Sequence, residues 1–406
     1  MSGLEQWIVR QWDHAARMML KSISPVGIVK ERPRFGQVII PKPGSVVASP
    51  VLAAYDPEPD YFFHWYRDSA LVMDALHLLR NDLAEAETYF QDYVRFSLDL
   101  GALDGRVTPP DWRARAAPDF QRFLRPGLEG AHGPAIAAET RVNPDGTLDI
   151  TDWPRPQHDG PALRALAAMR WGAEGEAAVL LRRDLAFVLR HARQPCFDIW
   201  EEEMGLHAYT MRVSAAALEK GAVWLAARGD TLESERCRTE AAAIETLLDD
   251  FWMEEARHIR SRKVEGGAPD KLLDVAVILA SNHADVVGER YTATLERLEA
   301  LFDATYAINR GRPAGRAPAM GRYANDKYYS GGAYYFATLG AAEFCYRIGE
   351  RARGDAYLET VRAFTPASGD LSEQFDRTTG AQTSARHLAW SYAAFLTVVA
   401  ARQARQ

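Results

Sequence analysis

The segment RDSALVMDALHLLR, residues 67–80, carries apolar side chains at intervals of three and four positions. This spacing is the period of an α-helix with one apolar face, so the segment predicts an amphipathic helix. Its stripe consists of Leu71, Ala75, Leu78 and Leu79. SARHLAWSYAAFLTVVAARQ, residues 384–403, has the same period and contains neither Gly nor Pro. Its stripe consists of Leu388, Tyr392, Phe395 and Val399.

Helical periodicity continues along most of the chain. Further helices are expected at about 3–22, 84–102, 161–171, 175–194, 207–228, 231–254, 270–281, 288–307, 330–349 and 351–363. The total is therefore about twelve helices. Strands are expected only as short pieces, QVIIP at 37–41 and VVASP at 46–50.

The connections between these helices alternate between short and long. The long ones, 103–160 and 308–329, are rich in Pro, Gly, Trp and Arg, and long irregular loops in a helical domain are usually functional. This alternation predicts an all-α toroid of six helical hairpins with its long loops at one mouth. No Pro/Ser-rich linker divides the chain, so a single domain over 1–406 is expected. The helix within 1–30 should pack on the barrel or form part of it.

Composition argues against several classes of protein. The chain has 406 residues, 47% of them hydrophobic, enough for a large core. Its formal net charge is −7 without a basic cluster, which argues against nucleic acid because that binding depends on neutralising phosphates. The longest apolar stretch, LAWSYAAFLTVVAA, is too short and polar to span a bilayer, so no membrane partner is expected. The amino terminus shows no signal-peptide pattern, which predicts a cytoplasmic protein.

The three cysteines agree with a reducing compartment. Cys196, Cys237 and Cys345 cannot all pair, and their spacing matches no zinc motif. We expect them to be buried, reduced thiols.

Acids, tryptophans and arginines gather in four stretches near expected loops. These are PDYFFHWYRDSALV (59–72), DWPRPQHDGPALRA (152–165), CFDIWEEEMGLHAYT (196–210) and SGDLSEQFDRTTGAQTSARHLAWSY (368–392). Asp68 could simply stabilise a helix dipole, and Asp159 could mark a helix start. Neither explanation accounts for the rings and arginines beside them. A sugar site would, because rings cover the apolar face of a sugar while Asp and Arg bond its hydroxyls.

Two acids from distant loops suggest glycoside hydrolysis. That reaction needs a protonated carboxylic acid to donate to the departing oxygen, and a carboxylate to activate water or attack the sugar. The three adjacent glutamates at 201–203 and Glu373 could supply such a pair across one pocket.

Five segments in order resemble the glucoamylases, glycoside hydrolase family 15. They are PDYFFHWYRDSALV, RPQHDGPALRA, FDIWEEEMG, GRYANDKYYSGG and LSEQFDRTTGAQTSARHLAWSYA. The resemblance runs from about residue 44 to residue 400 and covers only the catalytic domain of that family. It implies a six-hairpin helical barrel, (α/α)6, which agrees with the helix count obtained from periodicity.

The resemblance also implies a role for each matching residue. Glu201 matches the general acid and Glu373 the general base that activates water, whereas Glu203 has no matching role and is expected to be solvated. The positions that match substrate contacts are Tyr61, Trp65, Arg67, Asp68, Trp153, Trp200, Glu202 and Arg322. Tyr329 and Ser384 fall in matching segments and are expected to support them.

Inversion of the anomeric configuration follows from the same resemblance. It requires the two carboxyls to lie roughly 6.5–9.5 Å apart so that a water fits between them and the sugar. Partial burial and a neighbouring anion are expected to raise the pKa of Glu201 and keep it protonated. No metal and no cofactor are implied.

The sequence departs from the family pattern near the expected position of the leaving sugar. It has SGGAY at 330–334 where NGNPW is common, Met204 where Asn is common and Phe63 where Tyr is common. The sequence shows no pattern of a β-sandwich domain or a starch-binding module, so neither is expected. These departures favour short soluble gluco-oligosaccharides as substrates and leave the linkage open.

The sequence therefore predicts an inverting exo-acting α-glucosidase that releases β-glucose, as a monomer or weak homo-oligomer. An α-1,6-specific or trehalose-type glucosidase and a non-catalytic sugar-binding relative are the alternatives. Terpene cyclisation is disfavoured because Asp249-Asp250 lacks the third acid of a DDxxD metal site. The histidines nearest the expected pocket should have structural roles rather than bind metal; they are His64, His158 and His207.

Overall fold

Long helices alternate along the chain between an inner and an outer ring. The computed structural model describes residues 3–54, 58–101, 109–128 and 133–404. Within these ranges twelve helices have nine or more residues, in agreement with the predicted count, and α4 is a single turn. The helices are α1 Gly3–Leu20, α2 Tyr66–Leu76, α3 Ala86–Gly101, α4 Trp112–Arg115, α5 Asp159–Arg170, α6 Gly175–His191, α7 Ala208–Ala226, α8 Thr231–Asp249, α9 Ala276–Ala284, α10 Glu289–Thr305, α11 Tyr335–Arg347, α12 Arg351–Phe364 and α13 Ala389–Ala404.

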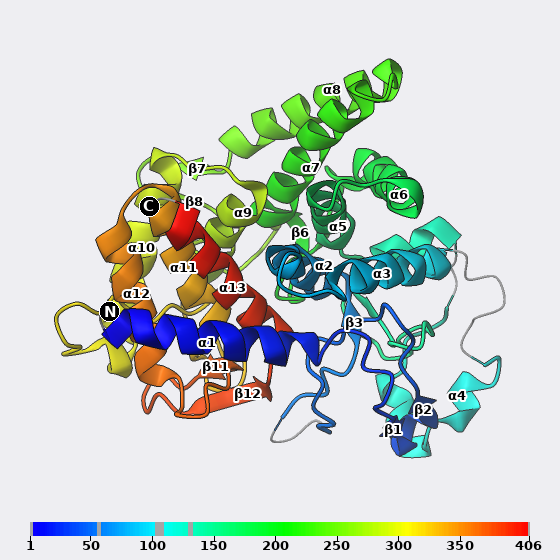
Figure 1. Ribbon diagram of the computed structural model, residues 1–406, viewed down its shortest axis with the longest axis horizontal. Coiled ribbons are helices and arrows are strands. Elements are labelled where there is room, and N and C mark those ends of the chain that lie inside the picture. Colours follow the sequence, from blue (N-terminus) through cyan, green and yellow to red (C-terminus); the bar gives the residue numbers. More distant parts are fainter. Residues whose placement is uncertain (1–2, 55–57, 102–108, 129–132, 405–406) are drawn as a thin grey trace.

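Six helices form the inner ring (Figure 1). Helices α2, α5, α7, α9, α11 and α13 contact one another in this order, and α13 returns to contact α2. Five of the inner helices also pack on an outer one, which for α5, α7, α9 and α11 is the next helix along the chain. The predicted (α/α)6 barrel is confirmed.

The outer partner of α13 is the first helix of the chain. Figure 1 shows α1 lying against α13, and α1 also contacts α12. Glu5 of α1 accepts a hydrogen bond from Arg402 of α13. Gln11 donates to the backbone oxygen of Gly369 at 2.8 Å. The two ends of the chain therefore meet in one part of the barrel wall.

Burial explains which helices lie inside. Nearly every side chain of α11 is buried, as expected for a helix surrounded by others. In α8 a single stripe is buried, with the three- and four-residue spacing of an outer helix. That stripe consists of Ser234, Cys237, Ala241, Ile244 and Leu248.

Short strands order the loops. They are β1 Lys30–Arg32, β2 Gln37–Ile39, β3 His64–Trp65, β4 Arg141–Val142, β5 Cys196–Phe197, β6 Met204–His207, β7 Trp252–Met253, β8 His258–Ile259, β9 Arg262–Lys263, β10 Ala333–Tyr334, β11 Ser372–Phe375 and β12 Gln382–Arg386. They pair antiparallel in five small sheets, including β5–β6–β9 and β10–β11–β12. Several of these strands lead directly into inner helices, so they fix the side chains at the start of each helix.

Several boundaries differ from the sequence prediction. The helix expected at 270–281 begins at Ala276, after a loop and a 3-10 turn, and the strand expected at 46–50 is only a bridge between Val46 and Ile23. The strand expected at 37–41 is β2, which pairs with β1. Residues 102–108 and 129–132 of the predicted connection 103–160 lie outside the described residues.

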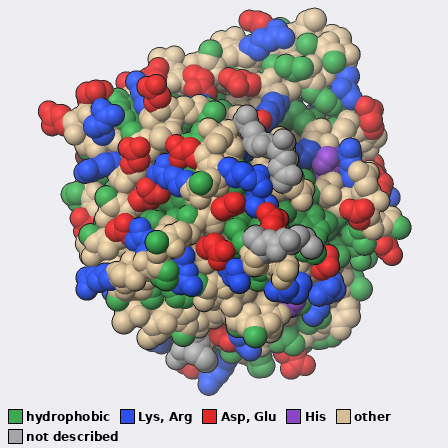
Figure 2. All heavy atoms as spheres, turned by 60° about the vertical axis from the view of Figure 1, so that its left-hand side comes forward, with side chains coloured by type: hydrophobic (Ala, Val, Ile, Leu, Met, Phe, Trp, Pro, Cys, Tyr) green, Lys and Arg blue, Asp and Glu red, His purple; other side chains and the backbone are tan. Residues whose placement is uncertain are grey.

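Charged side chains of both signs are intermingled on the visible face of Figure 2. On the face shown in Figure 2, basic side chains lie among acidic ones instead of gathering in one patch. Within the described residues, no helix is both long and apolar enough to cross a membrane.

Candidate active site

One cavity at the loop end of the barrel is lined by all ten predicted site residues. Its volume is about 260 Å³. The ten residues are Tyr61, Trp65, Arg67, Asp68, Trp153, Trp200, Glu201, Glu202, Arg322 and Glu373. The fold thus brings together side chains as far apart in sequence as Tyr61 and Glu373, which are 312 positions apart.

A tight turn between β5 and β6 separates the three adjacent glutamates. Asp198 builds this turn, because the backbone N–H groups of Glu202 and Glu203 donate to its Oδ1 at 2.8 and 2.9 Å. Glu201 has a φ of 64°, a left-handed conformation that costs energy for a residue other than glycine. The turn sends consecutive carboxylates to different partners, which is how the chain accommodates three in a row.

Glu201 is held in the cavity by three donors. The indole N–H of Trp65 donates to its Oε1 at 2.8 Å, and that of Trp153 donates to its Oε2. Arg67 Nη2 donates to Oε1 at 3.0 Å. The side chain is 9% exposed, so these donors fix the direction in which the carboxyl faces the cavity.

Arg67 lies at the centre of a group of acids. Besides Glu201, it donates to the side-chain oxygen of Gln157 at 3.0 Å. Asp68 and Asp159 lie 3.4 and 3.6 Å from its terminal nitrogens. One buried cation therefore faces three carboxyls, which leaves this corner of the cavity rich in acceptors.

Asp68 and Asp159 keep free hydrogen-bonding capacity. Asp68 Oδ2 and both carboxyl oxygens of Asp159 are buried and accept no hydrogen bond from the described residues. Burial raises the pKa of each to about 6, although Arg67 opposes the shift. Asp159 is the first residue of α5, as its sequence position suggested, and His158 before it makes no side-chain cap. Asp68, which lines the cavity, can bind a hydroxyl of a ligand.

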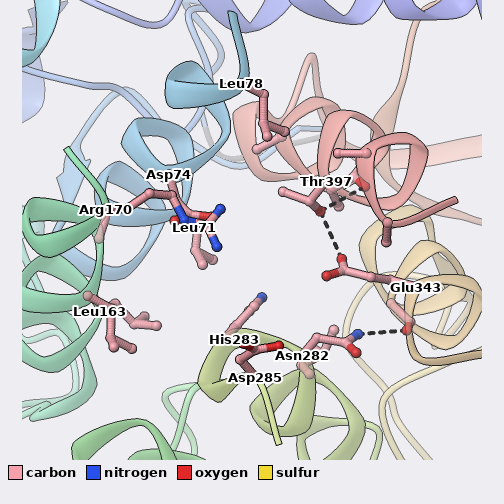
Figure 3. Close-up of a pocket in the computed structure, with 18 of the residues that line it drawn as sticks. Leu71, Asp74, Leu78, Leu163, Arg170, Asn282, His283, Asp285, Glu343 and Thr397 are labelled. Carbon is pink, nitrogen blue, oxygen red and sulfur yellow. Dashed lines mark hydrogen bonds and ion pairs between the residues drawn. The ribbon is translucent and has the colours of Figure 1, made fainter. Parts of the chain in front are cut away.

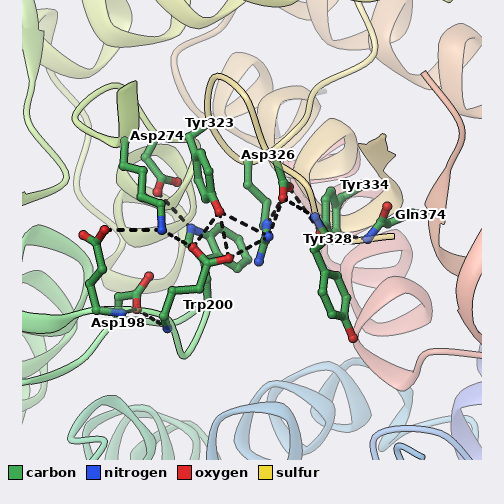
Figure 4. A network of polar contacts seen from close by, with 12 residues as sticks. Asp198, Trp200, Asp274, Tyr323, Asp326, Tyr328, Tyr334 and Gln374 are labelled. Carbon is green, nitrogen blue, oxygen red and sulfur yellow. Dashed lines mark hydrogen bonds and ion pairs between the residues drawn. The ribbon is translucent and has the colours of Figure 1, made fainter. Parts of the chain in front are cut away.

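Glu202 belongs to a separate polar network, of which Figure 4 labels Tyr323 and Asp326. Arg322 Nη2 donates to its Oε1 at 3.0 Å, Tyr323 donates at 2.7 Å, and Lys271 donates to its Oε2 at 2.6 Å. Burial alone would raise the pKa of Glu202, but Arg322, Lys271 and Tyr323 outweigh it and lower the pKa. Arg322 is fixed in turn by a two-point contact with Asp326 at 2.7 and 2.6 Å. Glu202 is therefore an ionised, rigid acceptor.

Glu203 corrects the expectation that it is solvated. Its side chain is 20% exposed and accepts a hydrogen bond from Arg262 at 3.0 Å. Arg262 also pairs with buried Asp274 at 2.8 Å, and Asp274 accepts from the indole of Trp200 at 2.9 Å. The contact of Glu203 with Arg262 thus helps to hold the turn in place.

The sequence suggested that Glu373 lies on a loop, but the structure places it in β11. Ser384 donates to its Oε2, and the Tyr61 hydroxyl donates to its Oε1 at 3.3 Å. Burial raises the pKa of Glu373 to about 7, against the hydrogen bonds that favour its charged form. The sequence argument did not anticipate a raised pKa at Glu373.

The tryptophans have different tasks. Trp65 and Trp153 meet edge to face, with ring centres 6.2 Å apart, and both direct their indole N–H groups at Glu201. Arg141 lies 3.6 Å from the ring centre of Trp153 and fixes its orientation. Trp200 points its N–H away from Glu201, toward Asp274, and stacks on Phe336.

Sequence reasoning missed several lining residues. Tyr328 lines the cavity and shares a 2.7 Å hydrogen bond with Tyr61, whereas the sequence singled out its neighbour Tyr329, which is 39% exposed. Phe336 and Trp390, at the start of α11 and α13, also line it. The sequence does not indicate which of the two adjacent tyrosines faces the cavity. Phe336 and Trp390 belong to helices whose apolar residues are typical of ordinary core.

The segment SGGAY requires its glycines. Gly331 has a φ of 55°, and a Cβ there would lie 2.0 Å from the backbone oxygen of Asp326. At Gly332 a Cβ would lie 2.3 Å from the oxygen of Phe375. The glycines allow the chain to pass beside Asp326, which holds Arg322, and to enter β10.

The described histidines and cysteines do not form a metal-binding group. Within the described ranges, no group of three His, Cys, Asp or Glu side chains could hold a metal ion. His64 accepts a hydrogen bond from the backbone N–H of Val46 at 2.9 Å, and His207 bonds backbone oxygens. The cysteines are free and buried.

A helical double ring whose pocket holds two glutamates beside tryptophans, arginines and further carboxyls defines the class of (α/α)6 glycoside hydrolases. A model of glycosyl hydrolases family 15 matches residues 35–100, 138–352 and 349–400. Glucoamylase-1 of Arthroderma benhamiae is 30% identical, over 89% of this chain and 65% of that protein. Glucoamylase 1 of Rhizopus oryzae is 26% identical, over 98% of this chain and 70% of that protein. The structure of the Hormoconis resinae glucoamylase matches with a TM-score of 0.80 at 27% identity, covering 99% of this chain and 74% of that one.

The chain therefore belongs to glycosyl hydrolase family 15, and the predicted resemblance is confirmed. It spans 65 to 70% of the length of the two relatives compared by sequence.

Proposed function

We propose that this protein is an inverting, exo-acting α-glucosidase of the glucoamylase type that releases β-glucose from short gluco-oligosaccharides. The observation that carries the proposal is the meeting of Glu201 and Glu373, from distant segments, in one small cavity. Sugar-binding alone would not require two such acids.

The two glutamates take complementary parts in a single displacement. Glu201 donates a proton to the glycosidic oxygen, while Glu373 removes a proton from water on the opposite face of the sugar. Glu373 suits the base because it is buried beside the hydroxyls of Tyr61 and Tyr328, which can position a water. The reaction needs no metal or organic cofactor.

The remaining contacts hold the substrate. Arg67 and Asp68 bind hydroxyls of the terminal glucose, with Asp159 supplying further acceptor capacity behind them. Rings pack on the sugar from three sides, from Trp65, Trp153 and Trp200. Glu202 and Arg322 bind the neighbouring, leaving sugar. The small volume of the cavity favours attack on a chain end rather than within a chain. We propose that the protein acts on its small-molecule substrate as a monomer or weak homo-oligomer.

The test is glucose release by three variants. Glu201→Gln and Glu373→Gln should each lose at least about 100-fold in kcat, because general acid–base catalysis contributes roughly 10²–10⁴-fold. Glu240→Gln, a control glutamate paired with Arg193 on the outer surface, should retain full activity. Maltose, isomaltose, kojibiose, nigerose and trehalose are compared, and the fastest identifies the linkage. Polarimetry of fresh product should show the β-anomer.

Two results would refute the proposal. One is a wild-type protein that binds these sugars but releases no glucose from any of them, which would favour a non-catalytic sugar-binding protein. The other is full activity in both site variants.

A further inference from the structure

A second cavity, larger than the first, lies at the opposite end of the barrel (Figure 3). Its volume is about 770 Å³, within the roughly 300–1,000 Å³ typical of ligand pockets. All six inner helices contribute to its wall. Arg67 and Asp68 begin α2 at the loop end, whereas Asp74, near the end of the same helix, lines the second cavity.

Polar side chains surround this cavity. Asp74 pairs with Arg170 at 2.9 Å on one side, and Glu343 accepts from Thr397 at 2.9 Å on the other. Figure 3 shows these pairs on different helices with His283 pointing into the space between them. The cavity thus offers donors and acceptors from several directions.

Two of these groups have unused hydrogen-bonding capacity. Asn282 donates to the backbone oxygen of Gly340 at 2.8 Å, but its own Oδ1 is buried without a partner among the described residues. One ring nitrogen of His283 bonds the hydroxyl of Tyr209 at 2.8 Å. Burial lowers the pKa of His283 to about 4, so the ring is neutral and keeps both donor and acceptor character.

The charges lining the cavity balance. Three cations, Arg170, Lys220 and Arg347, face three anions, Asp74, Asp285 and Glu343. Most of them are already paired with one another: Asp74 with Arg170, and Arg347 with Asp285 and Glu343. Neither a cationic nor an anionic ligand is favoured by this arrangement, and a neutral polar one is.

The inner end of the cavity is aromatic. Phe336 and Trp390 stack with ring centres 4.0 Å apart and an angle of 4° between their planes. Both rings line both cavities, so this pair is the wall between the two ends of the barrel. Leucines of three inner helices, Leu71, Leu163 and Leu279, extend the apolar surface. A fitting ligand has an apolar face and a polar edge.

We propose that this cavity binds a small neutral cyclic polyol of hexose size, with its C–H face toward Phe336 and Trp390 and its hydroxyls toward Asp74, Asn282, His283 and Glu343. The proposed reaction at the loop end would release such a molecule, glucose. Binding at the far end does not depend on that reaction, so either proposal can fail alone.

Amide hydrogen exchange with D-glucose as the probe tests the site in the full-length protein. Glucose at ten times its dissociation constant should slow exchange about tenfold at amides that open only when the ligand leaves. The slowing is expected in α9 and in the second half of α13. Gluconate and glucosamine, the charged counterparts, should have a much smaller effect at the same concentration.

Two variants separate the far cavity from the rest of the molecule. Ala394→Phe fills the cavity from α13 and should abolish the slowing in α9 while leaving any slowing in β11 and β12 unchanged. Ala242→Phe, on the exposed face of α8, should behave as wild type. Should Ala394→Phe fail to fold by circular dichroism, Ala401→Phe, half-buried in the same lining, takes its place.

The proposal is overturned if D-glucose leaves α9 exchange unchanged in the wild type, or slows it equally in the filled variant. Equal slowing by gluconate or glucosamine would overturn the neutral ligand class. Absence of glucose release from disaccharides concerns only the loop-end proposal.

Discussion

Glu201 and Glu373 share one cavity, yet their surroundings differ. Glu201 faces a guanidinium and two indole N–H groups, supplied by Arg67, Trp65 and Trp153. Glu373 accepts hydrogen bonds from the hydroxyls of Tyr61 and Ser384, and its pKa is raised to about 7 by burial. The charge of Arg67 thus positions Glu201, whereas desolvation raises the pKa of Glu373. Two carboxyls can take different parts in one reaction when their surroundings are built separately.

The largest effect is expected at the charged corner. Arg67→Lys keeps the charge but cannot reach Glu201 and Gln157 together, because an ammonium lacks the fork of a guanidinium. We expect kcat/KM to fall about 100-fold, or about 2.7 kcal/mol. Arg212→Lys is the control; it alters the ion pair of Arg212, near the start of α7, with Glu245. Steady-state kinetics with the preferred disaccharide measure both, and an equal loss in the control would remove the special role of Arg67.

The next effect concerns stability at the desolvated corner. The folded-state pKa of Glu373 lies above its ordinary 4.5, so its contribution to the free energy of unfolding is fully present below pH 4.5 and is lost as the pH rises through 7. Glu373→Gln stays neutral. Relative to wild type, the variant should therefore gain on the order of 2 kcal/mol between pH 4.5 and pH 8.

Urea unfolding at the two pH values measures this gain. Glu240→Gln, which removes a carboxyl paired with Arg193 outside the cavity, is the control. A flat difference between Glu373→Gln and wild type would mean that Glu373 is solvated in the folded protein.

The smallest effect is a shift of the pH profile. Ser384 donates to the charged form of Glu373, so Ser384→Ala should raise the pKa of Glu373. Activity needs the ionised base, so the acidic limb of kcat/KM should move to higher pH. Trp153→Phe removes a donor from Glu201 instead and should lower the rate without moving this limb. If both variants shift the limb alike, the two corners are not independent.

The sequence predicted the barrel well because its helices are long and strongly periodic. The periodic segment 67–80 contains most of α2. The segment 384–403 contains the end of β12 and most of α13. The prediction failed at boundaries governed by tertiary pairing. The start of α9 is delayed by a 3-10 turn, and Glu373 is drawn into β11 by pairing with β10 and β12.

The site could be predicted as a set of residues but not as a geometry. All ten candidates line one cavity, because the resemblance to the glucoamylases supplied them residue by residue. The choice between Tyr328 and Tyr329, the pairing of Glu203 with Arg262, and the burial of Glu373 depend on contacts across the fold. A linear pattern does not contain those contacts. The far cavity was invisible for the same reason, because alanines along α13 look like ordinary helix core.

The meeting of α1 and α13 has a consequence for how the molecule is made. During synthesis, α1 is made well before α13, so it has no inner helix to cover until α13 leaves the ribosome. Until then the open edges of α2 and α11 expose apolar surface that α13 will bury. A nascent chain stopped before residue 389 would carry every proposed catalytic side chain. It would still lack α13, the helix that closes the inner ring between α11 and α2.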